Sequence, residues 1–525
     1  MNTTQIISKI SNYIVSIVWL FLFLGCTTAM EQTKQLPKQS GQFSLFLNGP
    51  DSASLDITFT LQSISISSEN GSYIELLDFS KSINSLSVIH SQIGLAESVL
   101  PEGRYNKIRL IIGEAVIKKK NRVAHLALPT EGIEIPINIV IKQKGNVSIF
   151  LNWLVDSSIT DNYLFNPVLK VKKQTSELRS FLIYVTNESS NNVSVINRHT
   201  GEIVTNIMVG NKPRGIAASF NKERSKIYVA NSGSDSISII DPTTQKVENE
   251  IPVRFGKEPV GITVARLSPS SELIFVTNFI SNSVSVIDPT TFQETEKINV
   301  GHGPVSVAAE PPVEDLIGTR FLSFDDISAL KSYRDRFINV YVVNQNSNDV
   351  SVLRIDTASK KLNKITTLDV DWNPKAVSID YLRGKVYIAN YGSDKLSVID
   401  ILQLIRGNDS SAVSTINNVG HKIIDIIADP AFDRLYLLKQ FPPKIVILKP
   451  FESSFDNLKS IMPPVMGSIT VGDSPRSFIM DNETRMIYVV NQESNNISVV
   501  DKTAKRLDHE IPVGSMPYGI ALFRQ

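Results

Sequence analysis

The stretch Tyr184-Val185-Thr186-Asn187, followed after five polar residues by Val193-Ser194-Val195-Ile196-Asn197, decides how this chain folds. Both runs have the length of a strand and are rich in β-branched and aromatic residues. The residues that separate them are Glu, Ser and Asn, which favour turns. The pattern therefore predicts a β-hairpin.

This hairpin recurs along the rest of the chain. Seven copies begin at Tyr184, Tyr228, Phe275, Tyr341, Tyr387, Tyr436 and Tyr488. A third run, such as 203–209, and a fourth, such as 215–218, follow the hairpin and give four strands per repeat. Repeats of about 40–50 residues with four strands are typical of propeller blades. Because no helix separates the strands, a βαβ architecture is excluded.

These repeats resemble the YVTN family of β-propeller repeats, whose signature stands unchanged at 184–187. The resemblance covers about residues 180–525 and implies an all-β protein with a seven-bladed β-propeller over 176–525. An open solenoid of the same unit is the alternative, although solenoids need polar end caps.

The two ends of the repeat region favour a closed ring. The first copy starts at Tyr184 without a preceding inner strand, whereas a surplus strand-like run, 517–522, ends three residues before the last residue of the sequence. We expect this run to complete the first blade, which would leave no exposed sheet edge there.

Residues 41–175 contain no such repeat and predict a smaller, β-sandwich-like domain. Strand-like runs, several of them alternating, are separated by Gly and Pro, and they cover 43–47, 54–66, 105–112, 133–142 and 145–154. The segment 100–110 resembles a signature of an uncharacterised family of bacterial lipoprotein domains, for which there is no activity to transfer. We interpret Tyr105 and Arg109 as strand-packing residues with a buried stem.

The N-terminus predicts export and lipidation. The apolar run 14–25 is shorter than the roughly 20 residues that span a membrane, and it suits a signal peptide over 1–25. Leu22-Phe23-Leu24-Gly25-Cys26 resembles the bacterial lipobox, with Phe23 where that motif usually has Leu. The resemblance implies a lipid anchor on Cys26, a polar tether over 26–40, and a place in the cell envelope facing the periplasm or the exterior. An ordinary secretory signal or an uncleaved anchor is the alternative.

Composition and motifs restrict the chemistry. The 525 residues contain 53 Lys and Arg against 52 Asp and Glu, a net charge of +1, so no nucleic-acid partner is expected. A single cysteine excludes an intrachain disulfide and any Cys-based metal or c-type haem motif. Neither a Gly-x-Ser-x-Gly elbow nor a Walker loop occurs, and the six histidines are scattered. We therefore predict no catalytic or metal-binding residue, and no cofactor can be named.

The repeat geometry predicts a ligand site. In a closed propeller the turns that join the blades meet around the channel, so cations in those turns would share one low-dielectric funnel. The hypothesis is an anionic or polar ligand, such as a glycan or a peptide carboxylate, bound by Lys212, Arg214, Lys257, His302, Lys375, His421, Arg476 and Tyr518. The alternative is that these are solvated loop side chains.

Three functions remain open from the sequence. The first is a non-enzymatic lipoprotein that serves as a surface binding or adhesion scaffold. The second is an enzyme using the same propeller face, either lactonase-like or a cofactor-dependent oxidoreductase. The third is a purely structural surface protein. Separately, the widest repeat spacing comes from an insertion over 311–336, in which 325–336 predicts a short helix.

Overall fold

The computed structural model describes residues 39–77, 80–120, 122–160, 163–173, 181–221, 225–311, 322–450 and 465–523. The predicted signal peptide, Cys26 and nearly all of the tether lie outside these residues. Within them, no helix is both long enough and apolar enough to cross a membrane.

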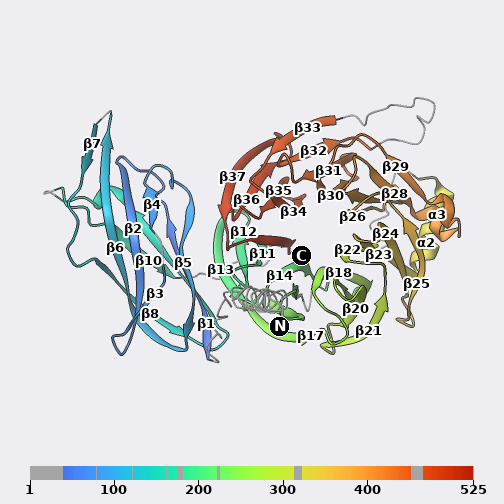
Figure 1. The fold of residues 1–525 in the computed structure, drawn as a ribbon, viewed down its shortest axis with the longest axis horizontal. Helices are drawn as coiled ribbons and strands as arrows, with labels where there is room; N and C mark the ends of the chain where they lie inside the picture. Colours follow the sequence, from blue (N-terminus) through green and yellow to red (C-terminus); the bar gives the residue numbers. More distant parts are fainter. Residues whose placement is uncertain are drawn as a thin grey trace, which may run out of the picture.

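The first unit consists of two β-sheets around one core (Figure 1). One sheet has the order β10-β9-β1-β5, in which β1 and β9 run parallel. The other has the order β3-β2-β6-β7, with β4 on β2 and β8 on β6. The strands are β1 (Ser40–Asn48), β2 (Asp56–Ser68), β3 (Tyr73–Glu75), β4 (Lys81–Asn84), β5 (Gln92–Pro101), β6 (Gly103–Lys119), β7 (Arg122–His125), β8 (Ile133–Ile141), β9 (Asn146–Leu154) and β10 (Val168–Lys173).

Aromatic side chains fill the centre of this core. The Trp153 ring stands edge-on to Phe59 at 5.2 Å between centroids, and its indole N–H donates to Ser158 Oγ at 3.0 Å. Tyr105 is buried in β6 and its hydroxyl donates to the Pro101 carbonyl, while Arg109 pairs with Glu134. Both contacts agree with the strand-packing interpretation.

Seven four-stranded antiparallel sheets form the propeller, so the predicted fold class is confirmed (Figure 1). The first blade combines β11 (Leu182–Asn187), β12 (Asn192–Asn197) and β13 (Glu202–Met208) with β38 (Pro517–Leu522). The second and third contain β14 (Pro213–Ala218), β15 (Ile227–Asn231), β16 (Ser236–Asp241), β17 (Lys246–Pro252), β18 (Pro259–Ser268), β19 (Ser271–Asn278), β20 (Ser283–Asp288) and β21 (Gln293–Asn299).

The remaining blades follow in chain order. The fourth and fifth contain β22 (Pro304–Ala309), β23 (Phe337–Asn344), β24 (Asp349–Asp356), β25 (Leu362–Asp369), β26 (Pro374–Asp380), β27 (Lys385–Asn390), β28 (Leu396–Asp400) and β29 (Val413–Ile416). The sixth and seventh contain β30 (Ile423–Asp429), β31 (Arg434–Lys439), β32 (Lys444–Leu448), β33 (Val465–Thr470), β34 (Pro475–Asp481), β35 (Met486–Asn491), β36 (Asn496–Asp501) and β37 (Arg506–Pro512).

The ring closes as the sequence predicts. β38 pairs antiparallel with β11, with Leu522 opposite Ile183 and Ile520 opposite Val185. An ion pair crosses the same seam, because Arg198 in the first blade binds Asp481 in the seventh at 2.5 Å, and both side chains are buried. The first blade is therefore assembled from both ends of the repeat region.

The repeated asparagine has a structural role in the blade. It ends the second strand in an extended, buried position. The Asn278 amide donates to Ser283 Oγ and Ser285 Oγ on the next strand, five and seven residues on. A β-carbon at Gly256, in the preceding turn, would overlap this amide. Other copies repeat the arrangement, which explains the glycine in most blade-joining turns.

The N-terminal unit packs on the first blade through β1. Phe43, Leu45 and Leu47 point into the sandwich core, whereas alternate residues face the propeller. Phe46 stacks on Phe150 at 5.4 Å and joins a cluster with blade residues such as Ile203. This contact explains why β1 is buried along its whole length despite its polar alternation.

A buried carboxyl lies at this contact. Glu97 accepts hydrogen bonds from Gln42 at 3.0 Å and from Asn206 at 2.9 Å, and it also accepts one from Asn192. Burial raises the pKa of Glu97 above its ordinary value. Three amide donors thus converge on one carboxyl between the two units.

The insertion forms the expected helix, α2 (Phe324–Arg334). Ser323 caps it, and Asp326 pairs with Arg406 beyond the short helix α3 (Ile401–Ile405), at 2.7 Å. The helix belongs to the loop that precedes β23, so it lies away from the blade-joining turns.

Candidate functional site

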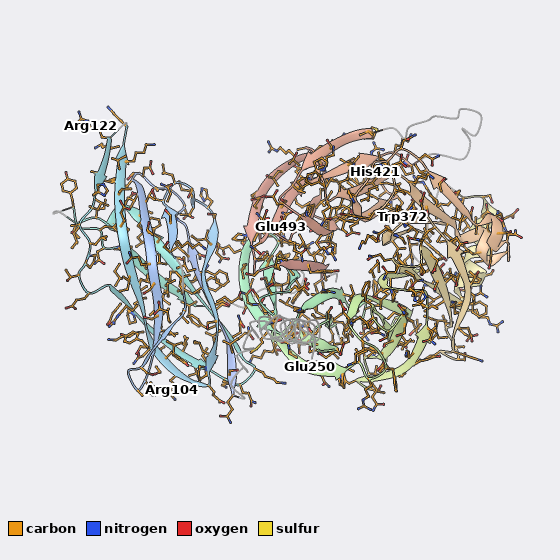
Figure 2. All side chains as sticks on the ribbon, in the orientation of Figure 1. Arg104, Arg122, Glu250, Trp372, His421 and Glu493 are labelled. Carbon is orange, nitrogen blue, oxygen red and sulfur yellow. The ribbon has the colours of Figure 1, made fainter. Side chains whose placement is uncertain are left out.

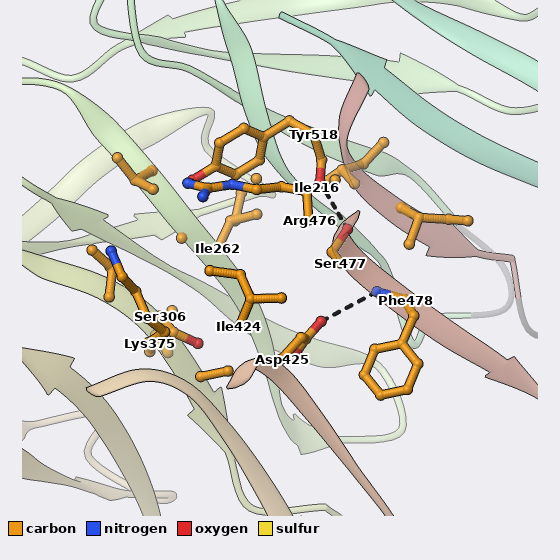
Figure 3. Close-up of a pocket in the computed structure, with 18 residues that line it drawn as sticks. Ile216, Ile262, Ser306, Lys375, Ile424, Asp425, Arg476, Ser477, Phe478 and Tyr518 are labelled. Carbon is orange, nitrogen blue, oxygen red and sulfur yellow. Dashed lines mark hydrogen bonds between the residues drawn. The ribbon is translucent and has the colours of Figure 1, made fainter. Parts of the chain in front are cut away.

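A cavity of about 220 Å³ opens where the seven inner strands begin (Figure 3). The inner strands are β14, β18, β22, β26, β30, β34 and β38, and every one of them contributes to its wall. The seven inner strands therefore converge on one cavity, directly after the turns that join the blades.

Each inner strand enters the channel in the same way. The residue just before it has a left-handed backbone, with φ of +49° at Lys212, +54° at Asn373 and +52° at Ser474. Proline follows in six of the seven blades and fixes the next φ. The next residue lies at the mouth, and this position is occupied by Arg214, Val260, Val305, Lys375, Arg476 and Tyr518 after the six prolines, and by Ile424 after Ile423.

Lys375 and Arg476 are the two cations in the cavity wall. The Lys375 ammonium donates to Gln345 Oε1 at 2.5 Å, and the Arg476 guanidinium donates to the Tyr518 hydroxyl at 2.6 Å. Neither side chain forms an ion pair with a carboxylate of the described residues. Burial and, to a smaller extent, the Arg476 charge lower the pKa of Lys375 to about 8.

Arg214 is neutralised, unlike these two. It pairs with Glu188 at 3.0 Å and with Glu258 at 2.7 Å, and its guanidinium lies 5.5 Å from the centre of the Tyr518 ring. The prediction that Arg214 adds free positive charge to the funnel is therefore wrong, because two carboxylates already compensate it.

Four other predicted residues lie outside the cavity wall. Lys212, Lys257, His302 and His421 are exposed on the blade-joining turns. Lys257 also pairs with Asp235 at 2.8 Å. The structure thus gathers Lys375, Arg476 and Tyr518 from the predicted set at one cavity, with Arg214 at its edge.

A second ring of residues, polar in six of the seven blades, was missed from the sequence. It consists of the residue that follows the repeated asparagine or its Lys439 counterpart, namely Glu188, Ser232, Phe279, Gln345, Tyr391, Gln440 and Gln492. Several of these side chains bind the first ring or each other: Glu188 holds Arg214, Gln345 holds Lys375, and the Tyr391 hydroxyl donates to Gln440. The position was available from the sequence, since it directly follows the repeated asparagine.

Asp425 was also missed. The third residue of the inner strand is Gly, Ser or Ala in six blades, since a β-carbon at Gly261 would press on the Val305 carbonyl at 2.7 Å. Asp425 breaks this rule. Its carboxylate accepts the backbone N–H of Ile426 at 2.8 Å and that of Phe478 in the next blade at 3.2 Å (Figure 3). Burial raises the pKa of Asp425 to about 7.

The cavity can therefore hold a small anion. Cationic groups lie at the mouth level, with apolar surface from Ile262, Ile424 and Ile520 beside them. Asp425 has a pKa suited to proton transfer, but its oxygens already link the sixth and seventh blades. No cluster of three or more His, Cys, Asp or Glu side chains that could hold a metal occurs in the described part of the chain.

Comparisons with known proteins concern the fold. Neither a family model nor a curated protein matches the sequence. A functionally unknown protein from Desulfotomaculum acetoxidans is 11% identical with a TM-score of 0.51, over 65% of this chain and 99% of that chain. Hydrazine synthase from Kuenenia stuttgartiensis is 17% identical with a TM-score of 0.47, over 61% and 92%. A 6-phosphogluconolactonase-like protein from Bacteroides fragilis is 16% identical with a TM-score of 0.46, over 65% and 97%. The likeness to both the YVTN family and the lipoprotein domain remains a resemblance.

Proposed function

We propose that this protein is a lipid-anchored binding protein of the cell envelope, related to YVTN propellers, whose channel holds a small ligand with an anionic group. The observation that carries the proposal is the pair Lys375 and Arg476, two half-buried cations at one cavity, neither paired with a carboxylate of the described chain. A buried charge is stable when an opposite charge binds it, so an anion would relieve both.

The size and wall of the cavity support a small ligand. About 220 Å³ is below the roughly 300–1,000 Å³ of sites for drug-sized molecules. The Tyr518 hydroxyl, already bound to Arg476, offers a further polar contact beside the cations. A scaffold without a ligand would not need two cations that face a cavity and form no ion pair with a carboxylate of the described residues.

Calorimetric titration of the full-length protein with acetate, succinate, phosphate and sulfate tests this function. We expect at least one of these anions to bind in wild type. Lys375→Gln with Arg476→Gln should weaken it about tenfold to a hundredfold, because a charge-assisted hydrogen bond contributes about 1.5–3 kcal/mol. Lys297→Gln on the exposed outer strand β21 is the matched control and should bind as wild type does. If none of the four anions binds, or if the double variant binds them equally well, the proposal is wrong.

The membrane anchor has a separate test. Cells grown with a labelled fatty acid should label the wild-type chain, and Cys26→Ser should remove the label and release the protein from the membrane fraction. Label retained on Cys26→Ser would exclude lipidation at this residue.

A further inference from the structure

We infer that the channel captures the C-terminal carboxylate of a partner polypeptide, whose last side chain enters the cavity while its preceding residues lie along three aromatic side chains at the mouth. The inference rests on the proposed anion-binding function and names the partner. The three side chains, Trp372, Tyr391 and Phe441, are called the aromatic arc below.

The cations suit a carboxylate at the end of a chain. Lys375 and Arg476 are each the second residue of an inner strand, so they lie at the entrance of the cavity and not at its floor. Figure 3 shows both side chains directed to the same side, with Ile262 and Ile424 between them. A carboxylate bound there leaves room for one apolar side chain beside the isoleucines, while the rest of the polypeptide leaves through the mouth. Capture of a terminal carboxylate is an established mode of peptide recognition.

The aromatic arc begins next to Lys375. Trp372 is 67% exposed and lies three residues before Lys375, on the fifth blade, on the side of the ring away from the N-terminal unit (Figure 2). Phe441 is 77% exposed on the sixth blade. Large exposed aromatic side chains close to a cavity are typical of binding surfaces.

Tyr391 connects the two ends of the arc. Its backbone N–H donates to the carbonyl of Asn373, the residue after Trp372, at 2.9 Å. Its hydroxyl donates to Gln440, the residue before Phe441, at 2.8 Å. The Lys375 ammonium lies 5.8 Å from the centre of the Tyr391 ring, and the Lys422 ammonium lies 4.5 Å from it. Tyr391 therefore links Lys375 to the two turns that carry Trp372 and Phe441.

The composition of this surface favours a polypeptide over an acidic sugar chain. A sugar carries hydroxyl groups around its ring, and those that met Ile262, Ile424 or Ile520 would lose hydrogen bonds to water without replacement. An apolar C-terminal side chain loses nothing at the same wall and gains the burial of its surface.

Two pools of synthetic octapeptides, randomised at the last four positions, test the inference on immobilised full-length protein. One pool ends in a free carboxylate and the other in an amide, and bound peptides are identified by mass spectrometry. We expect enrichment from the carboxylate pool alone, with an apolar last residue. The affinity of an enriched peptide should fall at least about tenfold in Lys375→Gln with Arg476→Gln, and several-fold in Trp372→Ala with Phe441→Ala.

The controls are Lys297→Gln, and Phe324→Ala, which removes a side chain 84% exposed at the start of α2, away from the mouth. Both should bind the peptide as wild type does. Enrichment from neither pool, equal enrichment from the amide pool, or an unchanged affinity of the Trp372 and Phe441 variant would each overturn the inference. So would binding of acidic oligogalacturonates in place of peptides. If small anions bind at Lys375 and Arg476 but no peptide does, the proposed function holds and this inference falls; if neither binds, both fall.

Discussion

Replacing Leu522 with alanine tests how the propeller is held closed. Leu522 is 6% exposed and packs in one cluster with Ile183, Val185 and Tyr488, which belong to the first and seventh blades. Removing the buried side chain should lower the free energy of unfolding by about 2–5 kcal/mol, the range for leucine-to-alanine changes in cores. The value belongs in the upper half of this range if the terminal strand detaches, because β11 then also loses its partner strand.

The measurement is urea unfolding followed by far-UV circular dichroism, with the change in midpoint multiplied by the slope of the transition. Leu507→Ala is the matched control, because Leu507 lies on β37 of the neighbouring blade and is 40% exposed. Its effect should stay within about 0.5 kcal/mol. Equal effects of the two substitutions would show that β38 adds nothing to the stability of the ring, and the closure argument would fail.

Three further predictions concern the turns, the channel and the contact between the two units. Gly256→Ala should destabilise the protein by about 1–3 kcal/mol in thermal or urea unfolding, because the new methyl group overlaps the Asn278 amide. Gly94→Ala is the control and should not destabilise the protein, because its new methyl group meets only a Phe46 carbon at 4.0 Å. Equal effects of the two substitutions would contradict the packing role of the turn glycine. Anion binding in the channel should weaken roughly tenfold as the pH rises from 6 to 9, because Asp425, with a pKa of about 7, gains negative charge and Lys375, with a pKa of about 8, loses positive charge. Asp425→Asn should remove the part of this change that is centred near pH 7. A pH profile of the variant that keeps this part would exclude Asp425 as its cause. Because burial raises the pKa of Glu97, its ionisation costs stability as the pH rises through that pKa. The stability of Glu97→Gln relative to wild type, measured by urea unfolding, should therefore increase with pH. A stability difference that is independent of pH would argue against a buried ionisable group.

The sequence was most informative where the repeat supplied the same evidence several times. One copy such as 184–197 is an ambiguous hairpin, but copies at a nearly constant spacing fix the number of blades and the strands within each. The surplus run 517–522 is then expected to pair with β11, since β11 would otherwise remain an open sheet edge. Without such repetition, the N-terminal unit was predicted less completely. Its strand β5, with Gly94 and Glu97 in a half-buried pattern, was not foreseen.

The channel shows what local patterns leave out. The positive charge of Arg214 is compensated by ion pairs with Glu188 and Glu258, which come from two other turns. No residue near Arg214 in the sequence predicts either pairing. The residues at the mouth could be predicted from repeat position alone, whereas their electrostatic balance depends on contacts between blades. Asp425 could have been predicted from the sequence, because an acid among residues that are otherwise Gly, Ser or Ala is visible when the repeats are aligned.

The origin of the first blade from both ends of the repeat region has a consequence for biosynthesis. Throughout translation of residues 187–517, the apolar edge of β11 stays without its partner, so the ring cannot be completed while any part of the repeat region is missing. A message cut short before codon 517 yields a polypeptide with an open strand edge, which chaperones and proteases recognise. Completion of the ring thus acts as a checkpoint that only full-length products pass.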